Sequence, residues 1–316
     1  MKNSKVFYKF FALFCSICVL SSCNLIGAVQ QEDKKEKPVK KKEPPKPKRV
    51  SSKPAYTKGE LFILEYHRFG EKEGKYKRSF KNFKKDLETL YRLGFRPVTV
   101  SQILDKNLPN NRVLPPGASP VAFTFDDSTM SQFKMDYQGN TTKDCAVGIW
   151  REFAKKHPDF PVRATFYVLP GVTFGQKAHV MKKLGLLKAW GCEIGCHTVT
   201  HRSLRHLKPA SIKKEIVDSV DWIRSIGFEP TTIAVPYGNM PRPKNMKYIK
   251  GFEHSGKKYG FKANLRSMGR PARSPLSTRP EDPYRTPRIL GEDSRQAVTY
   301  WLKKVEEGEV LPYIQP

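Results

Sequence analysis

The stretch Val121-Ala-Phe-Thr-Phe-Asp-Asp-Ser128 decides the fold class of this chain. Its first five residues are uncharged and mostly β-branched or aromatic, which predicts a strand buried on both faces. Two adjacent carboxylates follow at its end, where they are costly unless their charge is used. In extended chain Asp126 and Asp127 point to opposite sides, so one can hold a cation while the other faces a reacting group. Taken alone, a turn in which both carboxylates cap backbone amides explains them equally well.

Apolar strands and amphipathic helices alternate around this stretch. Further strands are predicted at 61–66, 96–100, 164–169, 192–196, 231–235, 261–265 and 288–290. Helices are predicted at 80–91, 146–157, 178–190, 212–223 and 294–307, and Ser101 is expected to cap another helix. This alternation indicates parallel strands joined by crossover helices. Residues 59–316 therefore form one α/β domain, which has the size of a (β/α) barrel.

Composition excludes two classes of protein. The chain has 316 residues, of which 38% are hydrophobic, including 19 Phe and 13 Tyr. A wholly disordered chain lacks so many large rings, so a packed core is expected. No run of about 18 uncharged apolar residues occurs, which excludes a membrane protein with several spans.

The first residues have the pattern of an export signal. Three lysines precede the apolar run Phe10–Leu20, which is too short to cross a bilayer. The run ends in Leu20-Ser-Ser-Cys23, the pattern of bacterial lipoproteins. We expect residues 1–22 to be a signal peptide and Cys23 to carry lipid, which would make this a membrane-anchored protein of a bacterial cell envelope. An ordinary signal peptide cleaved nearby is the alternative.

Part of the net charge of +28 lies in a predicted tether, residues 23–58. This segment is rich in Lys and Pro and almost devoid of large apolar residues, so it is expected to be disordered. It holds 11 Lys/Arg and 4 Asp/Glu, and the signal adds three lysines, so residues 59–316 keep +18. Export argues against nucleic acid as the partner, and the aromatic residues do not interleave with basic runs. The expected partners are anionic lipid headgroups and acidic glycans.

Two more segments follow predicted strands. His197-Thr-Val-Thr-His201 places two imidazoles four residues apart, which converge if the loop takes one helical turn. Two histidines and one carboxylate are a common ligand set for a divalent metal. Pro236-Tyr237-Gly238 makes a sharp turn that can present a backbone N–H to an oxyanion. Loop histidines bonded to backbone, and an ordinary turn, are the alternatives.

Together, in this order, these segments resemble the NodB-type polysaccharide deacetylases, carbohydrate esterase family four. The motifs of that family are Thr-Phe-Asp-Asp, His-Ser/Thr-x-x-His and a Pro-aromatic turn. The resemblance runs from about residue 60 to 240, and Ile63-Leu-Glu-Tyr-His-Arg68 is similar to the Leu-x-Tyr-His segment of the family.

The resemblance implies a distorted (β/α) barrel and a metal-dependent hydrolase that removes N-acetyl groups from amino-sugar polysaccharide. Asp127, His197 and His201 would bind the divalent metal, most often zinc, with other transition metals as alternatives. Asp126 would be the general base, and the Tyr237 backbone N–H would hold the oxyanion. Further candidates for the substrate groove are Pro236, Gly238 and Arg288.

The sequence departs from the family pattern in four places. Ser128 replaces the usual Gly, and Ala234 stands where many members have an Arg that contacts the catalytic Asp. The segment Met130–Cys145 is an extra polar loop, either a rim of the groove or a surface excursion. The late Leu-x-Ile-His motif, which supplies the catalytic acid elsewhere, is absent. The acid is therefore open, with His254 or a metal-bound water as candidates.

A carbohydrate-binding lipoprotein that has lost activity is the alternative function. The absent Arg and late His favour it, whereas a retained base and three ligands oppose it. Cys192 and Cys196 frame one short strand, too far apart for a disulfide. The polymer, the metal and the oligomeric state are left open by the sequence.

Overall fold

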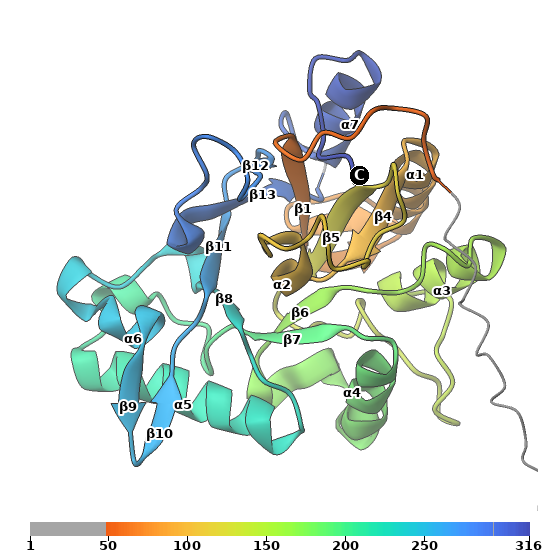
Figure 1. Cartoon of the computed structure of the whole chain (residues 1–316). Coiled ribbons are helices and arrows are strands. Elements are labelled where there is room, and N and C mark those ends of the chain that lie inside the picture. Colours follow the sequence, from red (N-terminus) through yellow and green to blue (C-terminus); the bar gives the residue numbers. More distant parts are fainter. Residues whose placement is uncertain (1–48, 293) are drawn as a thin grey trace, which may run out of the picture. The chain divides into compact units, whose positions relative to one another are not determined.

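The computed structural model describes residues 49–292 and 294–316 (Figure 1). The predicted signal peptide, Cys23 and the tether up to residue 48 lie outside the described residues. No helix within the described ranges is long and apolar enough to cross a bilayer.

Seven parallel strands form a closed barrel, as the sequence predicts. β1 pairs in parallel with both β5 and β13, and these two pairings close the sheet. β4 (Phe95–Val98) extends the sheet beside β5, and β12 (Ala272–Arg273) pairs antiparallel with β1. In order around the barrel the strands are β1 (Glu60–Tyr66), β13 (Thr286–Leu290), β11 (Ala263–Ser267), β8 (Thr232–Ala234), β7 (Glu193–Cys196), β6 (Thr165–Val168) and β5 (Ser119–Phe125).

Helices cover the outside of the barrel (Figure 1). They are α1 (Phe80–Arg92), α2 (Val100–Ile103), α3 (Ala146–Lys156), α4 (Val180–Ala189), α5 (Pro209–Ser225), α6 (Lys247–Lys250) and α7 (Val298–Glu306). Two small two-stranded sheets lie outside the barrel, β2 (Arg68–Gly70) with β3 (Lys77–Ser79), and β9 (Phe252–His254) with β10 (Lys257–Tyr259). The sequence did not predict these sheets or β12, because each strand is too short to show periodicity.

The strands are buried on both faces, and each face has its own core. Along β5, Phe123 and Phe125 pack outward against the helices with Trp150 of α3. Ala122, which directly precedes Phe123, points to the opposite face and belongs to a second core that includes Tyr167. Because side chains alternate along a strand, this phase places Thr124 and Asp126 on the inner side of the barrel.

Two predictions are corrected by the structure. The cap of α2 is Thr99, not Ser101: its side chain accepts from the Gln102 backbone N–H, and Gln102 bonds back to the Thr99 N–H. The predicted tether also ends too late. Its residues 49–58 lie against the domain, where Tyr56 forms a β-bridge with Ile314 and the Val50 N–H donates to Pro116. Val50 and Tyr56 lie in a basic, Pro-rich stretch of sequence, and this composition predicted a disordered segment.

Candidate active site

Three loops converge at the carboxyl ends of β5, β7 and β8, where parallel barrels place their chemistry. They line one pocket with a volume of about 350 Å³. Its walls hold Asp126 and Asp127 from the first loop, His197 and His201 from the second, and Tyr237 from the third. The structure thus brings together the predicted site residues, which are up to 111 positions apart in the sequence.

Asp127, His197 and His201 form a compact cluster. The Asp127 Oδ1 atom lies 3.3 Å from Nε2 of His197 and 3.2 Å from Nε2 of His201. One ligand atom from each of the three residues falls within 4.8 Å of the others. The Nδ1 atoms are engaged elsewhere, at 2.6 Å from the Ala234 carbonyl and 3.2 Å from the Tyr237 hydroxyl. The outer partners therefore turn both Nε2 atoms toward the carboxylate.

This cluster fits a divalent metal. Asp127 Oδ1 and His197 Nε2 are buried and have no hydrogen-bond partner among the described residues. Buried polar atoms are ordinarily satisfied, so a pair of orphans pointing at each other indicates a missing partner. Two imidazole nitrogens and one carboxylate oxygen suit a catalytic metal with open positions. Burial alone would raise the pKa of Asp127, but the two adjacent imidazoles hold that pKa far below its usual value.

Backbone strain is concentrated in these loops. Asp127, Ser128, Thr198, His201 and Tyr237 all have positive φ, between 46° and 69°. Such conformations are uncommon for residues other than glycine and typically persist where surrounding contacts enforce them. On the His197–His201 loop, the buried Glu215 carboxylate accepts from the Val199 and Thr200 backbone N–H groups.

Ser128 stands where the family pattern usually has glycine, and its contacts explain why a serine is tolerated at this position. Its φ of 46° is in the left-handed region that glycine favours. The side chain and backbone both find partners: Ser128 Oγ accepts from the Leu169 N–H at 3.2 Å, and its carbonyl accepts from the Phe174 N–H at 2.6 Å. These contacts offset the strain of a residue with a Cβ.

Asp126 has a different set of neighbours from Asp127. It is 2% exposed and receives both Nη atoms of Arg288, each at 2.7 Å. The same guanidinium lies 3.1 Å from Glu65 and donates to the Thr124 hydroxyl at 3.0 Å. Burial by itself would raise the pKa of Asp126, but Arg288 overrides it and keeps that pKa below its ordinary value. The carboxylate is therefore held ionised in a buried position.

Arg288 explains the missing arginine at position 234. Ala234 is fully buried on β8, and the guanidinium reaches Asp126 from β13 instead. Arg288 is part of the pocket wall, as expected of a groove candidate. Its guanidinium, however, forms ion pairs with the carboxylates of Glu65 and Asp126. A sequence signal existed: an arginine inside the strand Pro287-Arg288-Ile289 is costly unless an acid pairs with it.

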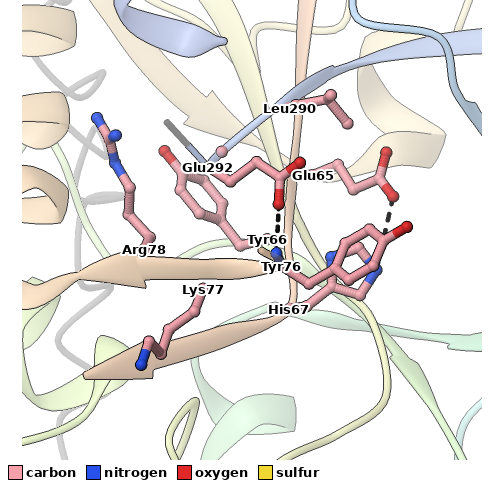
Figure 2. Close-up of a pocket in the computed structure, with 9 residues that line it drawn as sticks. Glu65, Tyr66, His67, Tyr76, Lys77, Arg78, Leu290 and Glu292 are labelled. Carbon is pink, nitrogen blue, oxygen red and sulfur yellow. Dashed lines mark hydrogen bonds and ion pairs between the residues drawn. The ribbon is translucent and has the colours of Figure 1, made fainter. Parts of the chain in front are cut away.

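His67 completes the site and was not predicted as a site residue. It follows β1, which lies between β13 and β5 in the barrel. Its Nε2 atom is 4.0 Å from Asp126 Oδ2 and 3.7 Å from Glu65 Oε1. Figure 2 shows the imidazole beside the Tyr76 ring, whose centroid is 5.0 Å away, and shows Glu292 accepting from the Tyr76 backbone N–H. The sequence signal for this residue is the Leu-x-Tyr-His segment, in which His67 directly follows a buried strand.

His254, a candidate for the catalytic acid, lies in the β9–β10 sheet and is not in the pocket wall. The extra loop 130–145 does not line the pocket either. The first turn of this loop instead holds the backbone of two site residues: the buried Gln132 amide donates to the carbonyls of His67 and Asp126. Tyr137 in this loop is 89% exposed.

The Pro-aromatic turn has divided roles. Tyr237 and Gly238 line the pocket, whereas Pro236 is buried beneath it. The fixed ring of Pro236 leads into the positive φ of 58° at Tyr237, which exposes 70% of the tyrosine at the pocket mouth. Of the groove candidates, Gly238 and Arg288 therefore contact the pocket and Pro236 does not.

The cysteines take no part in the site. Cys145, Cys192 and Cys196 are buried and unpaired. Burial raises the pKa of Cys196 to about 11, and its sulfur lies 3.3 Å from the Ser219 hydroxyl. Cys196 is not among the residues whose ligand atoms cluster at the candidate metal site.

Comparisons with known proteins agree with this geometry. Residues 114–251 match the family model described as polysaccharide deacetylase. No curated protein sequence matches the chain. The deacetylase PplD from Streptococcus pyogenes, solved with acetate, is 18% identical with a TM-score of 0.57, covering 82% of this chain and 100% of that one.

Two other solved structures share the fold. A polysaccharide deacetylase from Bacillus cereus is 17% identical with a TM-score of 0.57, covering 78% of this chain and 69% of its own. IcaB from Ammonifex degensii is 18% identical with a TM-score of 0.52, covering 78% and 96%. The segment that matches the family model contains both carboxylates, both histidines and the Pro-Tyr-Gly turn. Residues 114–251, the segment that holds the pocket motifs, are therefore similar to the polysaccharide deacetylase family.

Proposed function

We propose that this protein removes N-acetyl groups from an amino-sugar polysaccharide by metal-dependent hydrolysis. One observation carries the proposal. Two adjacent carboxylates in one pocket have opposite surroundings, because Asp126 is paired with Arg288 while Asp127 points an orphaned oxygen at two histidines. This division matches a base and a metal ligand.

Asp127, His197 and His201 would hold the metal, with zinc as the first candidate. When bound, a divalent metal lowers the pKa of a water and polarises a carbonyl oxygen. Asp126 is placed to accept the proton that water loses as it adds to the acetamide carbon. The Tyr237 backbone N–H is the proposed donor to the developing oxyanion. Breakage of the C–N bond then releases acetate and the free amine.

His67 is the proposed donor of the final proton to the leaving amine. His67 lines the pocket just after the end of β1. This strand neighbours β13, at whose end the late His motif of the family is absent. Its Nε2 atom lies 4.0 Å from Asp126 Oδ2, so the proposed acid and the proposed base would be neighbours. The same Nε2 atom lies 3.7 Å from Glu65 Oε1.

We further propose that the protein acts in a bacterial cell envelope, exported by residues 1–22 and anchored by lipid on Cys23. The Leu20-Ser-Ser-Cys23 sequence supports this placement. Loss of membrane association on Cys23→Ser, measured by fractionation of cells, would test the anchor.

The test of the activity is acetate release from N-acetylated glycans by the full chain, with and without a chelator. We expect release that stops on chelation and returns with added zinc. Metal-loaded protein that binds a glycan but releases no acetate from any of them would contradict the proposal. That result would favour an inactive carbohydrate-binding protein.

A further inference from the structure

Arg266 is a cation without a counter-ion in the pocket wall. It lies near the end of β11, half-buried, beside the Pro-Tyr-Gly turn: a Cβ on Gly238 would be 3.9 Å from its Nε atom. That Nε atom is buried and has no hydrogen-bond partner among the described residues. Burying part of a guanidinium without a partner costs free energy, so a functional reason is needed.

Each carboxylate of the pocket contacts a group other than Arg266. Arg288 binds Glu65 and Asp126, the two histidines contact Asp127, and Glu292 accepts from the Tyr76 backbone N–H. Within the described ranges, none of them forms an ion pair with Arg266. A second arginine of the wall, Arg68, is exposed and likewise has no carboxylate partner there.

We propose that Arg266, assisted by Arg68, recognises an anionic substituent of the substrate, a carboxylate or a phosphate carried by the N-acetylated sugar or its neighbour. This inference rests on the proposed deacetylase function and adds the substrate class. A guanidinium binds both groups through two parallel hydrogen bonds, which a neutral glycan cannot accept as strongly.

The position of Arg266 makes this recognition possible at the reacting sugar. The residue directly follows Leu265, which pairs with Ala234 of β8, and it precedes Ser267, whose hydroxyl donates to Glu65. It therefore lies between the turn proposed to hold the oxyanion and the carboxylate that supports Arg288. An anion bound there would lie in the same pocket as the acetamide. The charge of +18 on residues 59–316 would add long-range attraction for an acidic polymer.

The experiment compares three glycans of equal length. One is a neutral N-acetylglucosamine oligomer, one carries the lactyl carboxylate of N-acetylmuramic acid, and one carries a phosphate ester. We would measure kcat/KM for acetate release, and the affinity for each glycan by calorimetry. The proteins are the wild-type chain, Arg266→Gln, Arg266→Lys and Arg279→Gln, with folding checked by circular dichroism. Arg279 is exposed and outside the pocket, so it controls for net charge.

We expect the wild type and Arg279→Gln to prefer one of the anionic glycans by roughly tenfold in kcat/KM. Arg266→Gln should remove that preference through a higher KM, and Arg266→Lys should retain part of it. The glycan whose kcat/KM falls most in Arg266→Gln identifies carboxylate or phosphate as the recognised group.

Equal losses on neutral and anionic glycans, or no anionic preference in the wild type, would overturn the inference and leave the deacetylase function intact. Absence of acetate release from all three glycans would instead count against the proposed function. In that case the calorimetric preference for an anionic glycan, and its loss in Arg266→Gln, would still decide the inference.

Discussion

The pocket has two halves, one around Asp126 and one around Asp127, and these adjacent carboxylates have opposite surroundings. On the Asp126 side, Arg288 provides two hydrogen bonds and a buried ion pair, so the charge is compensated within the protein. On the Asp127 side, the Nε2 atoms of two histidines approach the carboxylate, and two buried atoms there, Asp127 Oδ1 and His197 Nε2, have no hydrogen-bond partner among the described residues. The charge of Asp126 is therefore balanced within the folded protein, whereas the atoms around Asp127 are available to the proposed metal.

The largest expected effect comes from breaking the cation-binding half. His197→Ala combined with His201→Ala removes two of three ligands, so metal affinity should fall by at least about 10³-fold. Metal content after dialysis, measured by atomic absorption, checks this. The matched control is His206→Ala, an exposed histidine outside the pocket, which should keep its metal. Full metal occupancy in the double variant would refute the ligand assignment.

The next largest effect comes from removing the ion pair between Arg288 and Asp126. Arg288→Met leaves Asp126 and Glu65 as buried charges without their partner, which should lower the free energy of unfolding by roughly 3–5 kcal/mol. Denaturant titration measures this, and Arg288→Lys should recover part of the loss. Arg92→Met, which breaks an exposed pair with Glu306, is the control and should change little. Equal stability of Arg288→Met and the wild type would show that the pair contributes nothing.

A smaller effect sharpens the account of how Arg288 is oriented. Thr124 donates to the Leu64 carbonyl at 2.7 Å and accepts from Arg288 at 3.0 Å. Thr124→Val keeps the shape and removes both bonds, so unfolding free energy should fall by about 1–3 kcal/mol. Denaturant titration tests this, with exposed Thr278→Val as a control. Unchanged stability would mean that the hydroxyl is dispensable.

The last effect depends on pH and concerns Lys183, a buried cation that has no carboxylate partner among the described residues. Its Nζ donates to the Phe174 carbonyl and to Gln176, and burial lowers its pKa to about 8. Since the unfolded chain binds more protons between about pH 8 and 10.5, the Lys183 contribution to stability should rise with pH there, by at most about 1.4 kcal/mol per pH unit.

This rise is measured as the difference in unfolding free energy between wild type and Lys183→Met at several pH values. Lys182→Met, the exposed neighbour, should show no such pH dependence relative to wild type. A difference that stays flat from pH 7 to 10 would contradict the lowered pKa. Arg288, with two carboxylates beside it, has its pKa raised rather than lowered.

Much of the fold was predictable, because the barrel strands are apolar on both faces and the helices between them are amphipathic. The cluster of Asp127, His197 and His201 was predictable in composition, since each residue follows a strand. The role of Arg288 was not, because the pairing of β13 with β1 joins residues more than 200 positions apart. His67 was hidden for the same reason: its place beside Asp126 depends on closure of the barrel by β1 and β5.

The central claim is that Asp126 acts as the base and Asp127 as a metal ligand. The most direct test is to measure bound zinc and acetate release for the matched variants Asp126→Asn and Asp127→Asn. The account predicts that Asp126→Asn keeps the metal and loses release, whereas Asp127→Asn loses both. Retained release in Asp126→Asn, or undiminished zinc affinity in Asp127→Asn, would contradict it.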